Sequence, residues 1–296
     1  MSRWKDPFKN IGKGRKPPKN HLFRWTFQNK TAKLFDIEQT AAFFRDSRAG
    51  IRTVHKRKDK DMKGIAYGVG VGPGDPELMT LKAVRMIREN DLFAVPGKDP
   101  RQSVAYKIAV RAVPELAEKE VISVYMPMVK NREMIGEEHK KGARFLEGYL
   151  DQGRNVVFLT LGDPTVYSTF SYLQHILEDD GYTVELVSGI PSFCAAAARL
   201  NIPLGEWDEP IHIIPAVHKT EALPADPGNY VLMKSASHMK EIKEILRSSG
   251  RDVNAVIDCG MDSEIVCRST EEIPDDAGYF SLIIAKEAGK QTLPQE

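Results

Sequence analysis

The sequence predicts an α/β protein with two domains. From Gly64 onward, short apolar runs alternate with amphipathic stretches, and glycine-rich turns directly follow two of the apolar runs. This alternation predicts a mostly parallel sheet with helices on both faces. Apolar residues make up 42% and charged residues 28% of the 296 positions, as in globular proteins. No apolar run reaches the roughly 20 residues that span a bilayer, and the N-terminus has no apolar signal-peptide core, so we expect a cytoplasmic protein.

The first domain is expected to span residues 63–188. Residues 65–71 form an apolar strand, and Leu78, Leu81, Val84 and Ile87 give residues 76–89 a helical stripe. The run at 155–161 is apolar throughout, which is typical of a strand buried on both faces. The same patterns predict further strands at 91–95, 121–125 and 183–187, and further helices at 101–113, 133–152 and 169–179.

The second domain is expected to span residues 189–296 and to be another α/β unit. An alanine-rich helix begins after Ser192, and a second helix is expected at 238–248. Strands are expected at 211–215, 229–233, 255–258 and 279–285. The two domains are similar in size.

Residues 1–62 differ from the rest in charge. They hold 17 Lys and Arg against 6 Asp and Glu, a net charge of +11, whereas the remainder carries −10. One helix is expected at 31–48. Three interpretations stay open: a tail that binds nucleic acid or an acidic partner, a disordered extension, or a chain whose true start is Met62. The disordered extension and the later start are favoured, and nucleic acid is not expected as a partner.

The cysteine and histidine patterns argue against a disulfide framework or a metal site. Cys194, Cys259 and Cys267 are odd in number and lack CxxC spacing, so we expect small buried apolar residues in a reduced compartment. The seven histidines show no HExxH spacing, and we predict no metal ligand.

The first motif is Gly68-Val-Gly-Val-Gly-Pro-Gly-Asp-Pro-Glu77, where a strand runs into a glycine-rich loop and a helix. Glycines permit positive φ and let a ligand approach the backbone, while Asp75 suits a helix N-cap. The glycine spacing does not fit the dinucleotide-binding fingerprint, and no Gly-Lys-Ser/Thr follows as in a P-loop. An ordinary Rossmann methyltransferase would also carry an acidic residue where this chain has Pro96-Gly97.

Two further motifs follow later strands. In Leu159-Thr-Leu-Gly-Asp-Pro-Thr-Val-Tyr-Ser-Thr169, Asp163 lies at the carboxyl end of a strand, where ligands bind in parallel sheets. Asp163 would then orient a cofactor, or alternatively only cap the next helix. In Val187-Ser-Gly-Ile-Pro-Ser-Phe-Cys-Ala-Ala-Ala-Ala198, small residues at a helix start allow close helix packing or close ligand approach.

In this order and spacing, the three motifs resemble the tetrapyrrole methylase family, over about residues 63–287. The resemblance implies two α/β domains with a cleft between them that holds S-adenosylmethionine, and a homodimer. Within the family, the Tyr-Ser-Thr and Ser-Phe-Cys elements are similar to the branch that methylates carbon 20 of precorrin-2 or of its cobalt-containing counterpart. The uroporphyrinogen methylases have Gly-Ile-Thr-Ala where this chain has Gly189-Ile-Pro-Ser192.

The resemblance also assigns cofactor-binding positions. They lie on the three motifs and on two shorter elements of the second domain, and are Pro73, Leu161, Gly162, Asp163, Val166, Pro191, Ser192, Met233 and Gly260. The aspartate that uroporphyrinogen methylases carry in their second strand falls near Pro96, so no acid–base role is transferred from it.

The implied reaction is a direct displacement that positions the methyl donor and the acceptor carbon in line, with a base or water taking the leaving proton. The catalytic base stays unassigned. Tyr167 and His212 are candidates from their place near motif or strand ends, and the alternative for His212 is a hydrogen-bonded strand histidine. The implied substrate carries eight carboxylates. Four cations near the motifs are candidate clamps or, alternatively, ordinary surface charges: Lys98, Arg101, Arg199 and Lys234.

Other readings are weighed against this one. A family member acting at another ring carbon, or on an unrelated substrate, would lack these Tyr-Ser-Thr and Ser-Phe-Cys elements. A non-catalytic regulator that binds S-adenosylmethionine would be expected to have a damaged Gly-Pro-Gly or Gly-Asp-Pro, and both are intact. Whether the macrocycle arrives with cobalt is left open.

Overall fold

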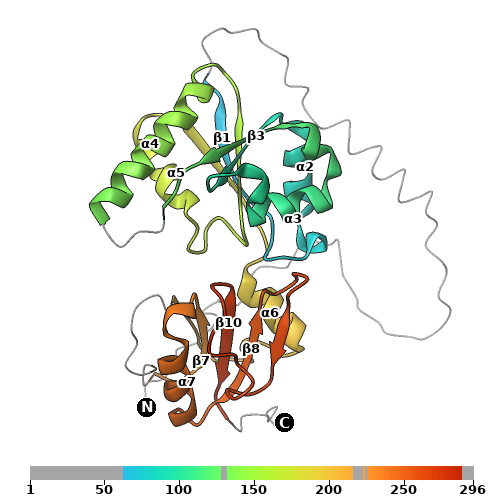
Figure 1. Cartoon of the computed structure of the whole chain (residues 1–296), viewed down its shortest axis with the longest axis vertical. Helices are drawn as coiled ribbons and strands as arrows, with labels where there is room; N and C mark the ends of the chain where they lie inside the picture. The colour runs from blue at the N-terminus through green and yellow to red at the C-terminus, as the bar shows by residue number, and fades with distance from the viewer. Residues whose placement is uncertain (1–62, 128–131, 216–222, 224–225, 289–296) are drawn as a thin grey trace, which may run out of the picture. The chain divides into compact units, whose positions relative to one another are not determined.

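The computed structural model describes residues 63–127, 132–215, 223 and 226–288. The chain divides into the units Met1–Lys58 and Asp59–Glu296, and every element below belongs to the second unit. The basic segment 1–62, with the helix expected at 31–48, lies outside the described residues. The described part comprises two five-stranded sheets, each with helices on both faces, which is the α/β arrangement with two domains that the sequence predicts (Figure 1). The exact domain boundaries stay a prediction.

The first sheet is parallel throughout. Its strand order is β3-β2-β4-β1-β5, so the two central strands, β4 and β1, are followed by the second and first motifs. The carboxyl ends of these strands therefore meet at one edge of the sheet. The strands are β1 (Ile65–Gly70), β2 (Leu92–Pro96), β3 (Glu120–Val124), β4 (Val156–Thr160) and β5 (Thr183–Val187).

Helices cover both faces of this sheet because its central strands are apolar on both sides. All five residues of β4 are buried. Val157 and Leu159 pack toward helices α2 (Leu81–Glu89) and α3 (Val104–Ala112). Val156 and Phe158 pack toward α4 (Arg132–Leu150) and α5 (Phe170–Asp179), on the opposite face (Figure 1). The alternation follows from the two-residue period of a strand.

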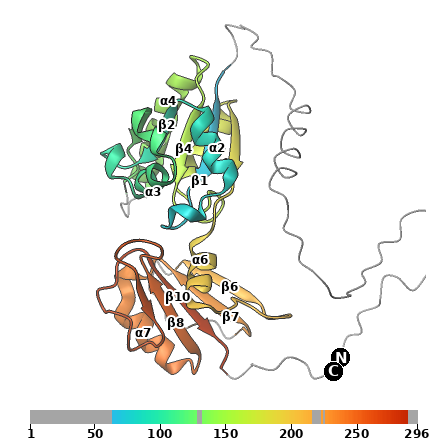
Figure 2. The ribbon, with the colours of Figure 1, turned by 90° about the vertical axis from the view of Figure 1, so that its right-hand side faces the viewer.

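The second sheet is mixed, with order β6-β7-β10-β8-β9. Only β6 and β7 are parallel; the three other pairs in this order are antiparallel. The strands are β6 (Ile211–Pro215), β7 (Asn229–Met233), β8 (Asp252–Ile257), β9 (Ile265–Cys267) and β10 (Ser281–Lys286). Helices α6 (Ser192–Leu200) and α7 (Met239–Ser248) pack on opposite faces of this sheet (Figure 2).

Two expected helices are each divided. Residues 76–89 form a short 3-10 helix (Pro76–Leu78) and then α2, because the Thr80 hydroxyl accepts a hydrogen bond from Ala83 N at 3.2 Å and so caps a new helix. Residues 101–113 likewise form a 3-10 turn (Pro100–Gln102) followed by α3. Further 3-10 turns are Pro114–Glu118 and Ala236–His238. No helix in the described ranges is long and apolar enough to cross a bilayer.

Candidate active site

The first two motifs are joined through their backbones. Gly72 donates its N–H to the Gly162 carbonyl at 3.2 Å, and Gly162 donates to the Gly72 carbonyl at 2.8 Å. Both residues have positive φ, 77° and 70°, where glycine has no Cβ penalty. The loops after β1 and β4 therefore form one small antiparallel bridge at the end of the sheet.

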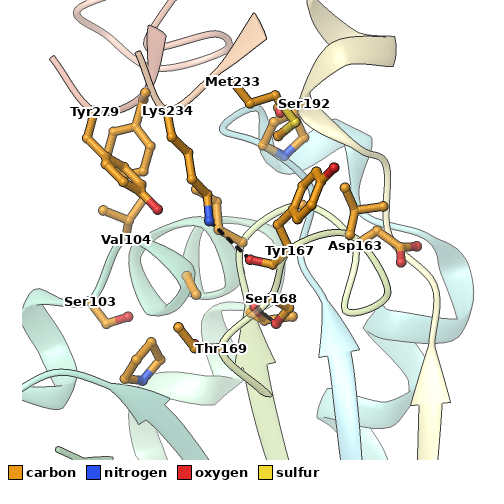
Figure 3. Close-up of a pocket in the computed structure, with 18 of the residues that line it drawn as sticks. Ser103, Val104, Asp163, Tyr167, Ser168, Thr169, Ser192, Met233, Lys234 and Tyr279 are labelled. Atoms are coloured by element: carbon orange, nitrogen blue, oxygen red, sulfur yellow. Dashed lines mark hydrogen bonds between the residues drawn. The ribbon is translucent and has the colours of Figure 1, made fainter. Parts of the chain in front are cut away.

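Asp163 ties the second motif to the third. It is only 7% exposed, its Oδ2 accepts a hydrogen bond from Gly189 N at 2.9 Å, and its Oδ1 accepts from Thr165 N at 2.8 Å and from the Thr165 hydroxyl. The helix-cap alternative is wrong, because α5 begins only at Phe170. In Figure 3 the carboxylate points away from Lys234 and Tyr279. The structure thus gives Asp163 a role in holding the loops, and its role toward a cofactor stays a prediction.

The glycines of the three motifs permit close contact between backbones. A Cβ at Gly70 would lie 2.5 Å from the Gly162 carbonyl oxygen, and one at Gly189 would lie 2.0 Å from the same atom. A Cβ at Gly74 would lie 2.2 Å from the carbonyl oxygen of Cys259, at the end of β8. Ligand approach was expected at the glycines of the first motif, and either close packing or ligand approach at those of the third; in the structure, other backbone segments approach Gly70, Gly74 and Gly189.

A cavity of about 680 Å³ lies at the carboxyl ends of the first-sheet strands and is closed by residues of the second sheet. This volume is in the range of small-molecule sites. Its lining includes eight of the nine predicted cofactor positions: Pro73, Leu161, Gly162, Asp163, Val166, Pro191, Ser192 and Met233.

Gly260 is the predicted position that does not line the cavity. Its φ is 77°, a Cβ there would lie 2.5 Å from Asp75 N, and its own N–H donates to Glu264 Oε2 at 2.8 Å. The adjacent Cys259 lines the cavity instead. Burial raises the pKa of the Cys259 thiol to about 11, so it remains protonated at neutral pH and is a poor nucleophile.

One wall of the cavity was not predicted from the sequence. This wall comes from the loop after β2 with the start of α3, and from the approach to β10, and it consists of Pro96, Gly97, Asp99, Gln102, Ser103, Val104, Ala105, Tyr279, Phe280, Ser281 and Leu282. The Pro96-Gly97 turn could have indicated the first part, because it ends a parallel strand beside the motif strands. The second part carries no motif.

The four candidate clamps divide into two pairs. Lys98 and Lys234 line the cavity. Arg101 does not; it donates to the Tyr106 hydroxyl and the Ala117 carbonyl, both at 3.3 Å. Arg199 forms an ion pair with Glu264. For the two arginines, the alternative of a structural or surface charge therefore fits the structure better.

The two candidate bases are also separated. His212 Nε2 lies 2.9 Å from the Pro227 carbonyl oxygen, and its ring stacks on Tyr230. It does not line the cavity, so it is the hydrogen-bonded strand histidine of the alternative. Tyr167 lines the cavity, and its hydroxyl donates to the Ile213 carbonyl at 3.2 Å. Among the described residues, no group of three His, Cys, Asp or Glu side chains could hold a metal ion.

Comparison with protein families identifies the fold's relatives. The model of the tetrapyrrole (corrin/porphyrin) methylases matches residues 66–274. The chain belongs to this family. The match begins inside β1 and extends past β9, so it includes all three motifs and most of both sheets.

Individual relatives match about three quarters of the chain. The chain is 35% identical over 224 residues, 74% of its own length and 95% of the relative's, to a probable cobalt-precorrin-2 C(20)-methyltransferase of Methanocaldococcus jannaschii. It is 29% identical over 232 residues, 75% and 96% of the two lengths, to a cobalt-precorrin-2 C(20)-methyltransferase of Salmonella typhimurium. A precorrin-2 C(20)-methyltransferase of a Sinorhizobium species is 28% identical over 75% of this chain and 94% of that relative.

Solved structures show the same fold. A uroporphyrin-III C-methyltransferase of Thermus thermophilus, complexed with S-adenosyl homocysteine, superimposes with a TM-score of 0.55 at 22% identity, covering 75% of this chain and 92% of that one. A cobalt precorrin-4 methyltransferase superimposes with a TM-score of 0.53 at 20% identity, over 75% and 94% of the two chains.

Proposed function

We propose that this protein is an S-adenosylmethionine-dependent C-methyltransferase that methylates carbon 20 of precorrin-2 or of its cobalt-containing counterpart in cobalamin biosynthesis. The observation that carries the proposal is similarity over 94–96% of three relatives named for this C(20) reaction, in a chain whose three motifs are intact. We further propose a homodimer, as the family resemblance implies, and a cytoplasmic location, as the sequence composition indicates.

S-adenosylmethionine would occupy the part of the cavity formed by the three motifs. Pro73, Leu161, Val166 and Met233 give this part apolar walls for an adenosine, and the backbone of Ser192 at the start of α6 offers polar groups. These side chains and backbone groups fit a folded nucleoside with an amino-acid tail. The bound cofactor supplies an activated methyl group on a sulfonium. Gly260 does not line this part of the cavity, and we propose that it holds the turn that places the neighbouring Cys259 in the lining.

The residues of this chain would contribute mainly by positioning. The joined glycine loops provide a rigid wall, so the donor would be held in one orientation while the macrocycle approaches from the Ser103 and Tyr279 side. Apolar lining residues exclude water, which strengthens electrostatic contacts to the ring substituents. A hydroxyl pair, Thr160 and Ser168 at 2.9 Å, lies in the lining and can relay a proton. We assign no catalytic base.

The test is an anaerobic incubation with methyl-labelled S-adenosylmethionine and, in parallel, metal-free precorrin-2 and the cobalt-containing macrocycle. We expect label in one of the macrocycles, with nuclear magnetic resonance placing the methyl group on carbon 20. Label at another ring carbon would contradict the position, and no label with either macrocycle would contradict the proposed reaction.

A further inference from the structure

The charged side chains that line the cavity differ in their hydrogen-bond partners. In the described part of the chain, the lining holds two cationic side chains, Lys98 and Lys234, and two carboxylates, Asp99 and Asp163. Asp99 Oδ1 accepts from Arg101 N at 3.0 Å, and both oxygens of Asp163 accept hydrogen bonds as described above. Each carboxylate therefore accepts from a backbone N–H, whereas neither lysine forms an ion pair with a carboxylate among the described residues.

Lys234 is held by weak partners. Its Nζ donates to the Tyr167 carbonyl at 3.2 Å and lies 5.9 Å from the Tyr167 ring centre and 5.8 Å from the Tyr279 ring centre. A carbonyl and two aromatic faces stabilise an ammonium, but they do not neutralise it. Of its three donors, one is used by this protein oxygen among the described residues. Lys98 is exposed, and no ion pair of its ammonium occurs within residues 63–127, 132–215 and 226–288.

The backbone at this contact is in an unfavourable conformation. Lys234 has φ of 60° and Tyr167 has φ of 48°, both in the left-handed region that side chains other than Gly, Asn and Asp rarely adopt. The two residues come from different sheets, since Lys234 follows β7 and Tyr167 follows β4. Strain of this kind persists where the surroundings fix a geometry, and it is concentrated at ligand-binding sites.

The position of Lys234 separates two parts of the cavity. In Figure 3, Lys234 and Tyr167 lie between a side with Met233, Ser192 and Asp163 and a side with Ser103, Val104 and Tyr279. The first side holds predicted cofactor positions. The second side belongs to the wall formed by the loop after β2, which also carries Lys98.

We propose that Lys234, together with Lys98, binds carboxylate side chains of the macrocycle and so sets its orientation against the methyl donor. This inference rests on the proposed function, because it takes the substrate to be a polycarboxylate ring. A carboxylate would exchange the neutral Tyr167 carbonyl for a charged acceptor, and a charged pair is the stronger hydrogen bond. The strained loop holds the ammonium toward the macrocycle side before the substrate arrives. Lys234 is thus a substrate-orienting residue.

The experiment compares four proteins: the wild type, Lys234→Asn, Lys98→Met and the control Lys82→Met. Asparagine tolerates the left-handed backbone, so the first variant removes the ammonium without adding strain. Lys82 is exposed on α2 and does not line the cavity, so its variant matches the charge change alone. Each protein is titrated with uroporphyrin III, a stable fluorescent ring with eight carboxylates, and separately with S-adenosylhomocysteine by calorimetry.

We expect the dissociation constant for uroporphyrin III to rise about 10- to 100-fold in Lys234→Asn and about 3- to 10-fold in Lys98→Met, as for lost charge-assisted hydrogen bonds. The affinity for S-adenosylhomocysteine should change by less than about twofold, as should both affinities of Lys82→Met. Unchanged affinity of Lys234→Asn for the macrocycle would overturn the inference. Equal loss of both ligands would also overturn it, because that is the result expected if Lys234 only shapes the cavity.

Two outcomes separate this inference from the proposed reaction. If uroporphyrin III binding depends on Lys234 but neither macrocycle substrate accepts label, the carboxylate-binding role stands and the proposed reaction fails. If methyl transfer occurs with a KM for the macrocycle that is the same in wild type and Lys234→Asn, the reaction stands and the role of Lys234 fails. A wild type that neither binds the octacarboxylate nor transfers label contradicts both.

Discussion

Gly189→Ala tests whether the three motifs act as one structural unit. The added Cβ would lie 2.0 Å from the Gly162 carbonyl oxygen and 2.9 Å from two backbone carbons of Gly70, whereas ordinary contact begins at 3.4 Å. The loops would have to separate by roughly 1.4 Å at the tightest point. A shift of that size would also break the hydrogen bond from Gly189 N to Asp163, which is 2.9 Å long.

The expected cost combines overpacking, about 1–3 kcal/mol, with the loss of a hydrogen bond to a charged acceptor, about 1.5–3 kcal/mol. We therefore expect the free energy of unfolding to fall by about 3–5 kcal/mol, a large fraction of the roughly 5–15 kcal/mol of a typical domain. Gly189 is not among the glycines with positive φ, so the effect would be steric. Urea denaturation monitored by fluorescence measures it.

Gly148→Ala is the matched control. Gly148 lies in helix α4, is exposed, and a Cβ there would meet no atom within 4 Å. Alanine in a helix interior is favoured over glycine by about 0.5–1 kcal/mol, so this variant should be slightly more stable than the wild type. A Gly189→Ala protein that unfolds within about 1 kcal/mol of the wild type would refute the reasoning, because it would show that the loops tolerate separation.

Three further substitutions test individual carboxylates. Asp163→Asn should lower both the melting temperature and the affinity for S-adenosylhomocysteine, because the new NH2 group would face an N–H donor such as that of Gly189. Thermal denaturation measures the first effect and calorimetry the second. A loss of affinity without a loss of stability would instead indicate a role confined to the cofactor. Glu264 is partly buried, which opposes its ionisation, but the hydrogen bond from a backbone amide and the ion pair with Arg199 outweigh this desolvation and lower its pKa. Glu264→Gln should therefore be less stable than the wild type at neutral pH, and the difference should shrink as pH falls through the folded-state pKa, below about 4.3. For Glu147, burial and two neighbouring carboxylates raise the pKa, so the wild type loses stability as pH rises through that pKa. Glu147→Gln should melt higher than the wild type at neutral pH and equally at pH below about 4; the same melting temperature at both pH values would argue against the raised pKa.

The first sheet could be predicted closely because its strands are short apolar runs bounded by polar residues. The strand expected at 183–187 matches β5, and the others differ by one residue at one or both ends. In the second sheet, the strands expected at 211–215 and 229–233 match β6 and β7, whereas β9 was not expected. Ile265–Cys267 is three residues long and lies between Glu264 and Arg268, so no period is visible in its sequence. An apolar run also does not indicate whether its strand pairs parallel or antiparallel. The antiparallel pairing of β10 with β7 and β8 therefore could not be predicted.

The candidate site was predictable where a motif marks it. The three motifs carry the family resemblance, and that resemblance led to eight of the cavity-lining positions. In the wall that includes Ser103 and Tyr279, only the Pro96-Gly97 turn is marked in the sequence, and the two parts of this wall meet only through the packing of two sheets. The sequence indicated that the glycines permit positive φ and close approach. It did not show that the glycine loops of the three motifs would contact one another. Arg199 does not line the cavity and instead pairs with Glu264, which lies 65 residues away from it along the chain.

The central position of β10 in the second sheet has a consequence for the order in which the protein forms during synthesis. The five strands of the first sheet, with the glycine bridge, leave the ribosome before residue 190 and can assemble as a unit. The second sheet cannot form completely at that stage, because β7 and β8 both pair with β10, which lies between them and is synthesised last. Until Ser281–Lys286 is synthesised, β7 and β8 each have an edge with unpaired backbone N–H and C=O groups. Such edges can pair with other chains and so promote aggregation. The cavity would thus be completed at one of the latest steps of folding, and a truncated translation product would carry the glycine loops without a working pocket.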